Sequence, residues 1–153
     1  MHVLKAYIFN AQNIKRAYII GEEHYDTGND LFTMMLDQRM NYSCGYWRNT
    51  DNLDQSQVNK LDLVCRKLHL KPGMSVLEIG SGWGAFAKYA TENYGVSVHG
   101  ITVSKEQMNY AKKSCEGLSV TFELKDYREV DTKYDAIVSI GMFEHVGYKN
   151  YRD

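Results

Sequence analysis

The sequence has 153 residues, of which 44% are hydrophobic and 24% are charged, so it is one globular domain or a piece of a larger one. The net charge of −1 leaves no basic field for nucleic acid and no polybasic membrane anchor. Three scattered cysteines without zinc spacing argue against a disulfide framework and a metal site, and no apolar run approaches the ~20 residues of a membrane span. We therefore expect a soluble, cytoplasmic protein.

The first seventy residues are predicted to be helical. Apolar residues at helical spacing indicate one helix before Gly21, a short one in NDLFTMML and a stronger one in DNLDQSQVNKLDLVCRKLHL. Asp51 is the expected N-cap of the third helix, and Pro72-Gly73 ends the segment. The apolar stripe of that helix follows the i, i+3, i+4, i+7 pattern in Leu61, Val64, Cys65 and Leu68.

From about Lys71 onward, strands alternate with helices. Short apolar runs predict strands in MSVLEIG, VSVHGIT, LSVTFEL and YDAIVSI, with helices in AFAKYATENY and SKEQMNYAKKSC. Ser104 and Gln107 form an expected capping box at the start of the second of these helices. The alternation predicts an α/β fold with a mostly parallel sheet. A doubly wound sheet usually has about six strands, and the fourth strand here would be an exposed edge, so we expect a piece of a longer protein.

The stretch VLEIGSGWG places Gly80, Gly82 and Gly84 between the first strand and the next helix. Glycines there allow a tight turn and the close approach of a ligand to the backbone. The spacing differs from the GxGxxG of dinucleotide sites, and Trp83 is expected to fill the approach that a pyrophosphate would take. Glu78 suits a cationic or amine-bearing ligand. These features favour S-adenosylmethionine over NAD.

Two further positions are candidates for binding the ribose and the adenine of a nucleotide. Thr102 ends the second strand, where an acidic residue usually binds the ribose hydroxyls, and Gln107 one turn later could share that task. Asp126 follows the third strand and is placed to accept a hydrogen bond from an adenine amino group, with Tyr127 and Arg128 beside it. The alternative for Asp126 is a solvated acidic residue in a loop.

The segments HYDTGNDLF, MNYSCGYW, VLEIGSGWG, GITVSKEQ and IVSIGMFEHVG occur in this order and spacing. Together they resemble the cyclopropane-fatty-acyl-phospholipid synthases, which are similar to the mycolic acid cyclopropane synthases, over residues 16–153. The resemblance implies an N-terminal helical cap over the active site in residues 1–70. It also implies the first four parallel strands of a Rossmann-like class I methyltransferase sheet in residues 71–153.

By the same resemblance, four stretches bind S-adenosylmethionine, in addition to Asp126. Ser81 stands where the family usually has a cysteine. The four stretches comprise Tyr42 and Ser43; Val76, Leu77, Glu78, Ile79, Gly80, Ser81, Gly82, Trp83 and Gly84; Thr102, Val103, Ser104, Lys105, Glu106 and Gln107; and Tyr127 with Arg128.

The implied reaction adds a methylene across a cis double bond of an unsaturated phospholipid acyl chain. A bicarbonate ion, held near Cys44 and Glu144, is expected to act as the base; the family's further histidine and tyrosine have no counterpart in these residues. His145 is expected to orient the loop through a backbone hydrogen bond, with a catalytic role as the alternative. Aromatic rings can stabilise the positive charge that forms on the acyl chain. The candidates are Tyr25, Tyr42, Tyr46, Trp47 and Phe143, of which Tyr25, Tyr46 and Phe143 are assigned to the substrate pocket.

Two other functions stay open. The first is a related methyltransferase that acts on a small amine or another lipid, because fold does not determine function. The second is a non-catalytic fragment that binds S-adenosylmethionine, since these residues alone are expected to be inactive. The reading as a cyclopropane synthase further predicts peripheral contact with the inner membrane surface and allows a homo-oligomer.

Overall fold

The computed structural model describes residues 13–14, 17–18 and 29–152, and its centre is a parallel sheet. The strands are β1 (Ser75–Ile79), β2 (Ser97–Thr102), β3 (Val120–Leu124) and β4 (Ala136–Ser139). Their order is β3-β2-β1-β4, and every neighbouring pair is parallel. The predicted α/β fold with four parallel strands is confirmed.

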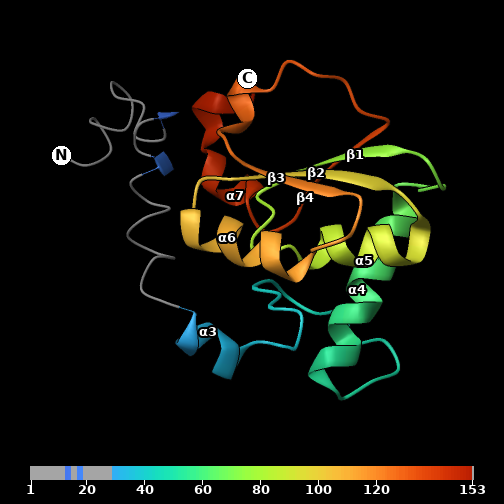
Figure 1. Ribbon diagram of the computed structural model, residues 1–153. Coiled ribbons are helices and arrows are strands. Elements are labelled where there is room, and N and C mark those ends of the chain that lie inside the picture. The colour runs from blue at the N-terminus through green and yellow to red at the C-terminus, as the bar shows by residue number, and fades with distance from the viewer. Residues whose placement is uncertain (1–12, 15–16, 19–28, 153) are drawn as a thin grey trace.

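Three helices lie together on one side of this sheet (Figure 1). They are α4 (Leu53–Lys67), α5 (Ala85–Tyr94) and α6 (Lys105–Ser114). The shorter elements are α3 (Asp30–Met35), η1 (Tyr127–Glu129), α7 (Phe143–Val146) and η2 (Tyr148–Asn150). Helix α3 confirms the short helix expected in NDLFTMML, whereas most of the helix expected before Gly21 lies outside the described residues.

The strand order determines where a ligand can bind. Strand β1 pairs with β2 on one side and with β4 on the other, so the chain first builds outward from β1 through β2 to β3 and then returns to the other side of β1 as β4. In open α/β sheets this reversal opens a crevice beyond the carboxyl ends of the strands. The glycine loop after β1 and the segment after β4 both begin at this crevice.

The hydrophobic core lies between the sheet and the three helices. Val76, Val98 and Phe122 from the strands pack with Phe86 and Ala90 of α5. Helix α4 adds Leu61 and Cys65, both fully buried, to the same core. The core therefore extends across residue 70, and the division into a cap and a Rossmann-like half stays a prediction.

Helix capping differs from the sequence-based expectation in two places. The N-cap of α4 is Asn52, whose side chain accepts a hydrogen bond from the Gln55 N–H at 3.0 Å, so the prediction of Asp51 was wrong by one residue.

In α6, Ser104 caps the helix as expected. The Gln107 side chain, however, accepts from the Thr102 hydroxyl at 3.2 Å, and that hydroxyl accepts from the Ser104 N–H. Thr102 thus bridges the two residues of the expected capping box.

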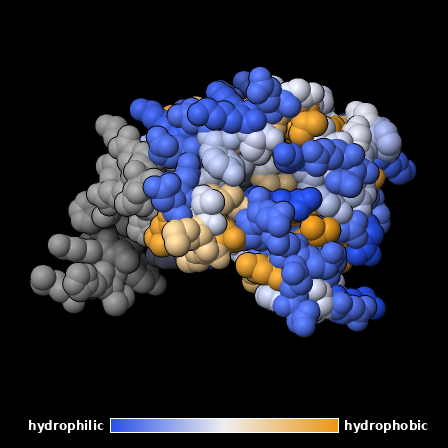
Figure 2. Space-filling view, turned by 60° about the horizontal axis from the view of Figure 1, so that its bottom comes forward, coloured by the Kyte–Doolittle hydropathy of each residue, from blue (hydrophilic) through white to orange (hydrophobic). Residues whose placement is uncertain are grey.

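The surface is mostly hydrophilic in the view of Figure 2, where hydrophobic residues form several small groups. Strand β4 is one edge of the sheet, and its Ile137 is 57% exposed, as the sequence predicted for an apolar edge strand. Across the part of the chain that the structure describes, no helix has the length and apolarity needed to cross a membrane.

Candidate active site

A cavity of about 310 Å³ lies at the carboxyl ends of the strands. Its wall is built from the segment 40–43, helix α4, the glycine loop, the end of β2, the loop 125–128 and the segment 140–146. Of the residues predicted to bind the cofactor, the wall contains Tyr42, Ser43, Glu78, Ile79, Gly80, Ser81, Gly82, Trp83, Thr102, Val103, Gln107, Asp126, Tyr127 and Arg128. The tertiary structure therefore brings together residues from all four predicted stretches.

Six residues from the same prediction lie outside the wall of the cavity. Each has another place in the structure, because the side chains of a strand or helix point in different directions. Val76 and Leu77 are buried in β1, a Cβ at Gly84 would touch Ala111 and Phe122, Ser104 caps α6, and Lys105 and Glu106 are exposed in the first turn of α6.

The glycine loop folds back onto β2. The N–H groups of Gly80 and Ser81 both donate to the Ile101 carbonyl, at 2.9 and 3.0 Å. Gly80 and Gly82 have positive φ angles, which glycine adopts without steric cost. A Cβ added at Gly82 would meet no atom within 4 Å, so this loop presents bare backbone to the cavity.

The Trp83 side chain connects the glycine loop to α3. The indole N–H donates to the Asn29 side chain at 2.8 Å, and the ring packs against Phe32 with the centroids 4.8 Å apart. Phe32, Met40 and Trp83 form a second, small hydrophobic cluster. Trp83 therefore joins the glycine loop, which lines the cavity, to α3 through a hydrogen bond and a ring contact.

Glu78 is a buried carboxylate in the cavity wall, and it is only 5% exposed. Burial raises its pKa to about 8, while a hydrogen bond from the Ala87 backbone and the charge of Lys60 act in the opposite direction. Its Oε2 atom has no hydrogen-bond partner among the described residues. A buried acceptor without a partner is unfavourable, so a cationic donor in the cavity would stabilise it.

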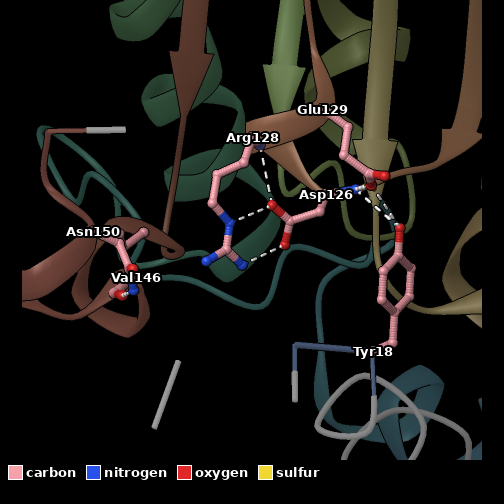
Figure 3. A network of polar contacts seen from close by, with 6 residues as sticks. All are labelled: Tyr18, Asp126, Arg128, Glu129, Val146 and Asn150. Carbon is pink, nitrogen blue, oxygen red and sulfur yellow. Dashed lines mark hydrogen bonds and ion pairs between the residues drawn. The ribbon is translucent and has the colours of Figure 1, made fainter. Parts of the chain in front are cut away.

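Asp126 is held by its neighbour in the sequence (Figure 3). The Arg128 guanidinium donates to both carboxylate oxygens, at 2.7 and 2.8 Å, and the Arg128 backbone N–H adds a third bond at 3.0 Å. Asp126 is only 3% exposed, so the alternative of a solvated loop residue was wrong. Burial alone would raise the pKa of Asp126, but the hydrogen bonds and charge of Arg128 outweigh it and lower the pKa.

The N-terminal part of the chain reaches this loop through Tyr18. The Tyr18 hydroxyl accepts from the Asp126 N–H at 3.1 Å and donates to the Glu129 carboxylate at 3.2 Å, as Figure 3 shows. Arg128 also lies over the Tyr127 ring, 5.2 Å from its centroid. The loop 126–129 is therefore ordered by contacts from both sides.

The two predicted catalytic residues do not border the cavity. Cys44 and Glu144 are both exposed. The neighbour of Glu144 in helix α7, His145, does line the cavity, as does Met142 just before that helix. The roles of Cys44 and Glu144 stay predictions.

The two predicted substrate-pocket residues that the structure describes, Tyr46 and Phe143, are also outside the wall. Tyr46 is half-buried and its N–H donates to the Ser56 carbonyl at 2.9 Å. Phe143 is exposed and stacks on Tyr151, with the ring centroids 4.9 Å apart. Trp47 is exposed, and Tyr25 lies outside the described residues.

Lys60 is the main wall residue that the sequence analysis missed. It is only 8% exposed, and its ammonium donates to the Asn41 side chain at 3.0 Å and to the Ser43 hydroxyl at 2.9 Å. A signal was present, because Gln57 and Lys60 continue the helical stripe of Leu61 and Val64 at i, i+3, i+4 and i+7. Within the described ranges, no group of three His, Cys, Asp or Glu residues could hold a metal ion.

The parallel sheet, the glycine loop and the cavity at the carboxyl edge define a Rossmann-like domain of the class I methyltransferase type. The chain belongs to the family described as mycolic acid cyclopropane synthetase, whose family model matches residues 12–153. The resemblance inferred from the sequence motifs is confirmed.

Individual relatives agree with this assignment. The cyclopropane-fatty-acyl-phospholipid synthase of Escherichia coli strain K12 is 56% identical over 151 residues, which cover 99% of this chain and 40% of the relative. The structure of the mycolic acid cyclopropane synthase CmaA1 complexed with SAH and CTAB has a TM-score of 0.83 at 39% identity, covering 88% of this chain and 49% of that one. The cyclopropane synthase MmaA2 from Mycobacterium tuberculosis has the same TM-score at 37% identity, with 86% and 48% coverage. The chain thus spans about 40% of the length of the Escherichia coli relative.

Proposed function

We propose that the cavity binds S-adenosylmethionine, and that the protein transfers a methylene group from it to a cis double bond of an unsaturated phospholipid acyl chain. The observation that carries the proposal is the buried carboxylate of Glu78, which lies in the cavity wall beside the bare backbone of the glycine loop. Its Oε2 atom has no hydrogen-bond partner in the part of the chain that the structure describes. A related structure, that of CmaA1, was solved with SAH.

The residues present fit such a ligand. Glu78 Oε2 and Ser81 Oγ are buried polar atoms without partners among the described residues, and both residues line the cavity. Gly82 leaves room for close approach of the ligand to the backbone. Thr102 and Gln107, joined by a hydrogen bond at 3.2 Å, offer polar groups suited to ribose hydroxyls. An amine and a ribose can thus each find a complementary group.

When bound, S-adenosylmethionine supplies a methyl group activated by a sulfonium. An alkene is a poor nucleophile, so the residues of the chain contribute mainly by fixing the donor and the acyl chain in one geometry. Glu78, in the cavity wall, balances the positive charge of the bound donor. The Tyr42 ring borders the cavity and packs edge-on against Phe32 at 5.4 Å, where an aromatic face can stabilise positive charge on the acyl chain.

Bicarbonate stays a prediction for the base, with Cys44 and Glu144 as its holders. Among the described residues these two side chains are exposed and do not form an enclosed anion site. Of the two titratable residues of α7, His145 borders the cavity and Glu144 does not.

Peripheral contact with lipid is proposed for the surface of α3. Leu31, Met34 and Met35 are exposed there, and Met34 is 90% exposed. Exposed apolar side chains on one short helix are suited to the boundary between headgroups and acyl chains. A location at the inner membrane surface and a homo-oligomer both stay predictions.

The test uses the full natural chain and titration calorimetry with S-adenosylhomocysteine. We expect the wild type to bind, and Glu78→Gln to weaken binding by about tenfold or more, because a charge-assisted hydrogen bond contributes about 1.5–3 kcal/mol. Glu92→Gln, at an exposed position on α5, is the matched control and should bind like the wild type. Absence of wild-type binding would refute the cofactor assignment.

The reaction is tested separately with unsaturated phospholipid vesicles and S-adenosylmethionine. Mass spectrometry should show a gain of one CH₂ per modified double bond. Cofactor binding without this gain would favour the alternatives, a methyltransferase for a small amine or another lipid, or a non-catalytic binding fragment.

A further inference from the structure

The segment 41–48, of which residues 41–43 line the cavity, is held against α4 by hydrogen bonds. The Gln57 side chain donates to the Ser43 carbonyl at 2.9 Å, and the Tyr46 N–H donates to the Ser56 carbonyl at 2.9 Å. A Cβ added at Gly45 would lie 2.2 Å from the Ser56 hydroxyl, so the backbone rests directly on the helix. Helix α4 therefore determines where this part of the wall stands.

Lys60 is the charged member of this contact. Its ammonium can donate three hydrogen bonds, and among the described residues it makes two, to Asn41 and to Ser43. Asn41 is in turn held by Asp37, whose carboxylate accepts from its backbone and side-chain N–H groups at 2.6 and 2.9 Å. The lysine thus belongs to a buried polar network that ends at the cavity wall.

The carboxylates of Asp37 and Glu78 act on the buried ammonium of Lys60. Burial lowers its pKa to about 8, against the opposing effect of Asp37, Cys44 and Glu78. Burying an ammonium costs free energy, and a neutral side chain of the same length would fill the space without that cost. A function of the charge at the cavity accounts for its presence there better than packing does.

The geometry of the Ser43 hydroxyl points to that function. Because its oxygen accepts the hydrogen bond from Lys60, its own hydrogen is directed elsewhere, and Ser43 lies in the wall. The hydroxyl is therefore prepared as a donor, and the nearby ammonium makes it a stronger one. A donor next to a positive charge is complementary to an anion.

We propose that Lys60 is a positioning residue, which orients the Ser43 hydroxyl so that it donates a hydrogen bond to the carboxylate of the ligand's amino-acid part. The ammonium of the same part of the ligand then faces Glu78. The proposal rests on the proposed function of the cavity. The wall then carries a negative group for the ammonium and a polarised donor for the carboxylate, so it recognises both charges of an α-amino acid. No covalent step is involved.

The test compares two probes on the full natural chain by titration calorimetry. One is S-adenosylhomocysteine, and the other is its decarboxylated analogue, which keeps the amine and lacks the carboxylate. Lys60→Met should weaken binding of the first by about tenfold and leave binding of the second within about twofold, because only the first probe uses the polarised hydroxyl. A lysine that merely stabilises the fold would change the affinity for both probes equally, and that result would overturn the proposal.

Two further variants complete the design. Ser43→Ala should show the same selective loss, and Lys60→Met added to Ser43→Ala should cause little further loss, because Lys60 acts through Ser43. Additive losses would contradict the proposal even if Lys60→Met alone folds poorly. Lys67→Met, at the exposed end of α4, is the matched control for removal of a charge from the helix. If the wild type binds neither probe, the proposed cofactor is wrong. If the wild type binds S-adenosylhomocysteine and Lys60→Met binds it with the same affinity, only the role of Lys60 is wrong.

Discussion

Glu78 and Asp126 are both carboxylates buried in the wall of one cavity, yet their surroundings move their pKa values in opposite directions. Burial raises the pKa of Glu78 to about 8. The pKa of Asp126 is lowered, because the hydrogen bonds of Arg128 outweigh the effect of burial. Asp126 is thus a fixed anion that shapes its loop, whereas Glu78 can change its charge near neutral pH when a ligand arrives.

Replacing Asp126 by Asn tests the first of these roles. Arg128 would lose its charged partner while remaining largely buried, so we expect the free energy of unfolding at pH 7 to fall by about 3 kcal/mol. Urea denaturation measures this, with the exposed Asp131→Asn as control. Because the pKa of Asp126 is lowered, its contribution is lost as the pH falls through that value, and the difference between wild type and variant should shrink in acid. Equal effects of both variants would contradict the prediction.

At the scale of elements, the residues at which α4 and α6 begin influence which of their side chains line the cavity. Asn52 begins α4, and the position of that helix brings Gln57 and Lys60 against the segment 41–48. Ser104 begins α6, and Thr102 bridges it to Gln107 at the edge of the cavity. The polar groups at the helix termini therefore also help to position side chains of the cavity wall.

The cap of α4 provides a direct test at this scale. Asn52→Ala removes the acceptor of the Gln55 N–H and should lower the free energy of unfolding by about 1 kcal/mol. Asp51→Ala changes the neighbouring residue and should cost only a few tenths of a kcal/mol, the size of a charge effect at a helix N-terminus. Chemical denaturation of both variants measures the difference. A larger loss for Asp51→Ala would show that the cap lies one residue earlier.

For the whole molecule, one core joins α4 to the sheet and its two crossover helices. The cavity lies where β1, β2 and β4 end, so its wall is supported by the core on one side and by the loops on the other. A charge buried in that wall is consequently linked to the stability of the entire fold.

Stability should therefore depend on pH through Glu78. Its folded pKa of about 8 lies above the ordinary 4.5, so between these values the folded chain binds more protons than the unfolded chain. The free energy of unfolding should fall as the pH rises through this window, and the fall should be smaller in Glu78→Gln. Lys60, with its pKa lowered from 10.5 to about 8, acts in the opposite sense above pH 8. Thermal unfolding across this range measures the effect, with Glu92→Gln as control, and parallel curves for wild type and Glu78→Gln would contradict it.

The sequence by itself determined the elements and the class of the fold. Hydrophobic periodicity marks the four strands and the helices α5 and α6. A helix that crosses over the sheet returns the chain to the end where the previous strand began, so strands joined in this way are parallel. The glycine loop and Glu78 also indicated a ligand site at the carboxyl end of β1. A tight turn needs glycine at particular positions, so this feature is visible in a short stretch of sequence. These features need no knowledge of distant contacts.

Only the tertiary structure decided which polar side chains face the cavity. Lys60 belongs to an amphipathic helix, and its burial depends on the segment 41–48 packing over it. The pairing of Asp126 with Arg128 depends on how its loop turns, and Glu144 and His145 differ because successive residues of a helix point about 100° apart. Burial and charge pairing arise from contacts between segments far apart in the chain, which is the physical reason that the sequence pattern alone could not assign them.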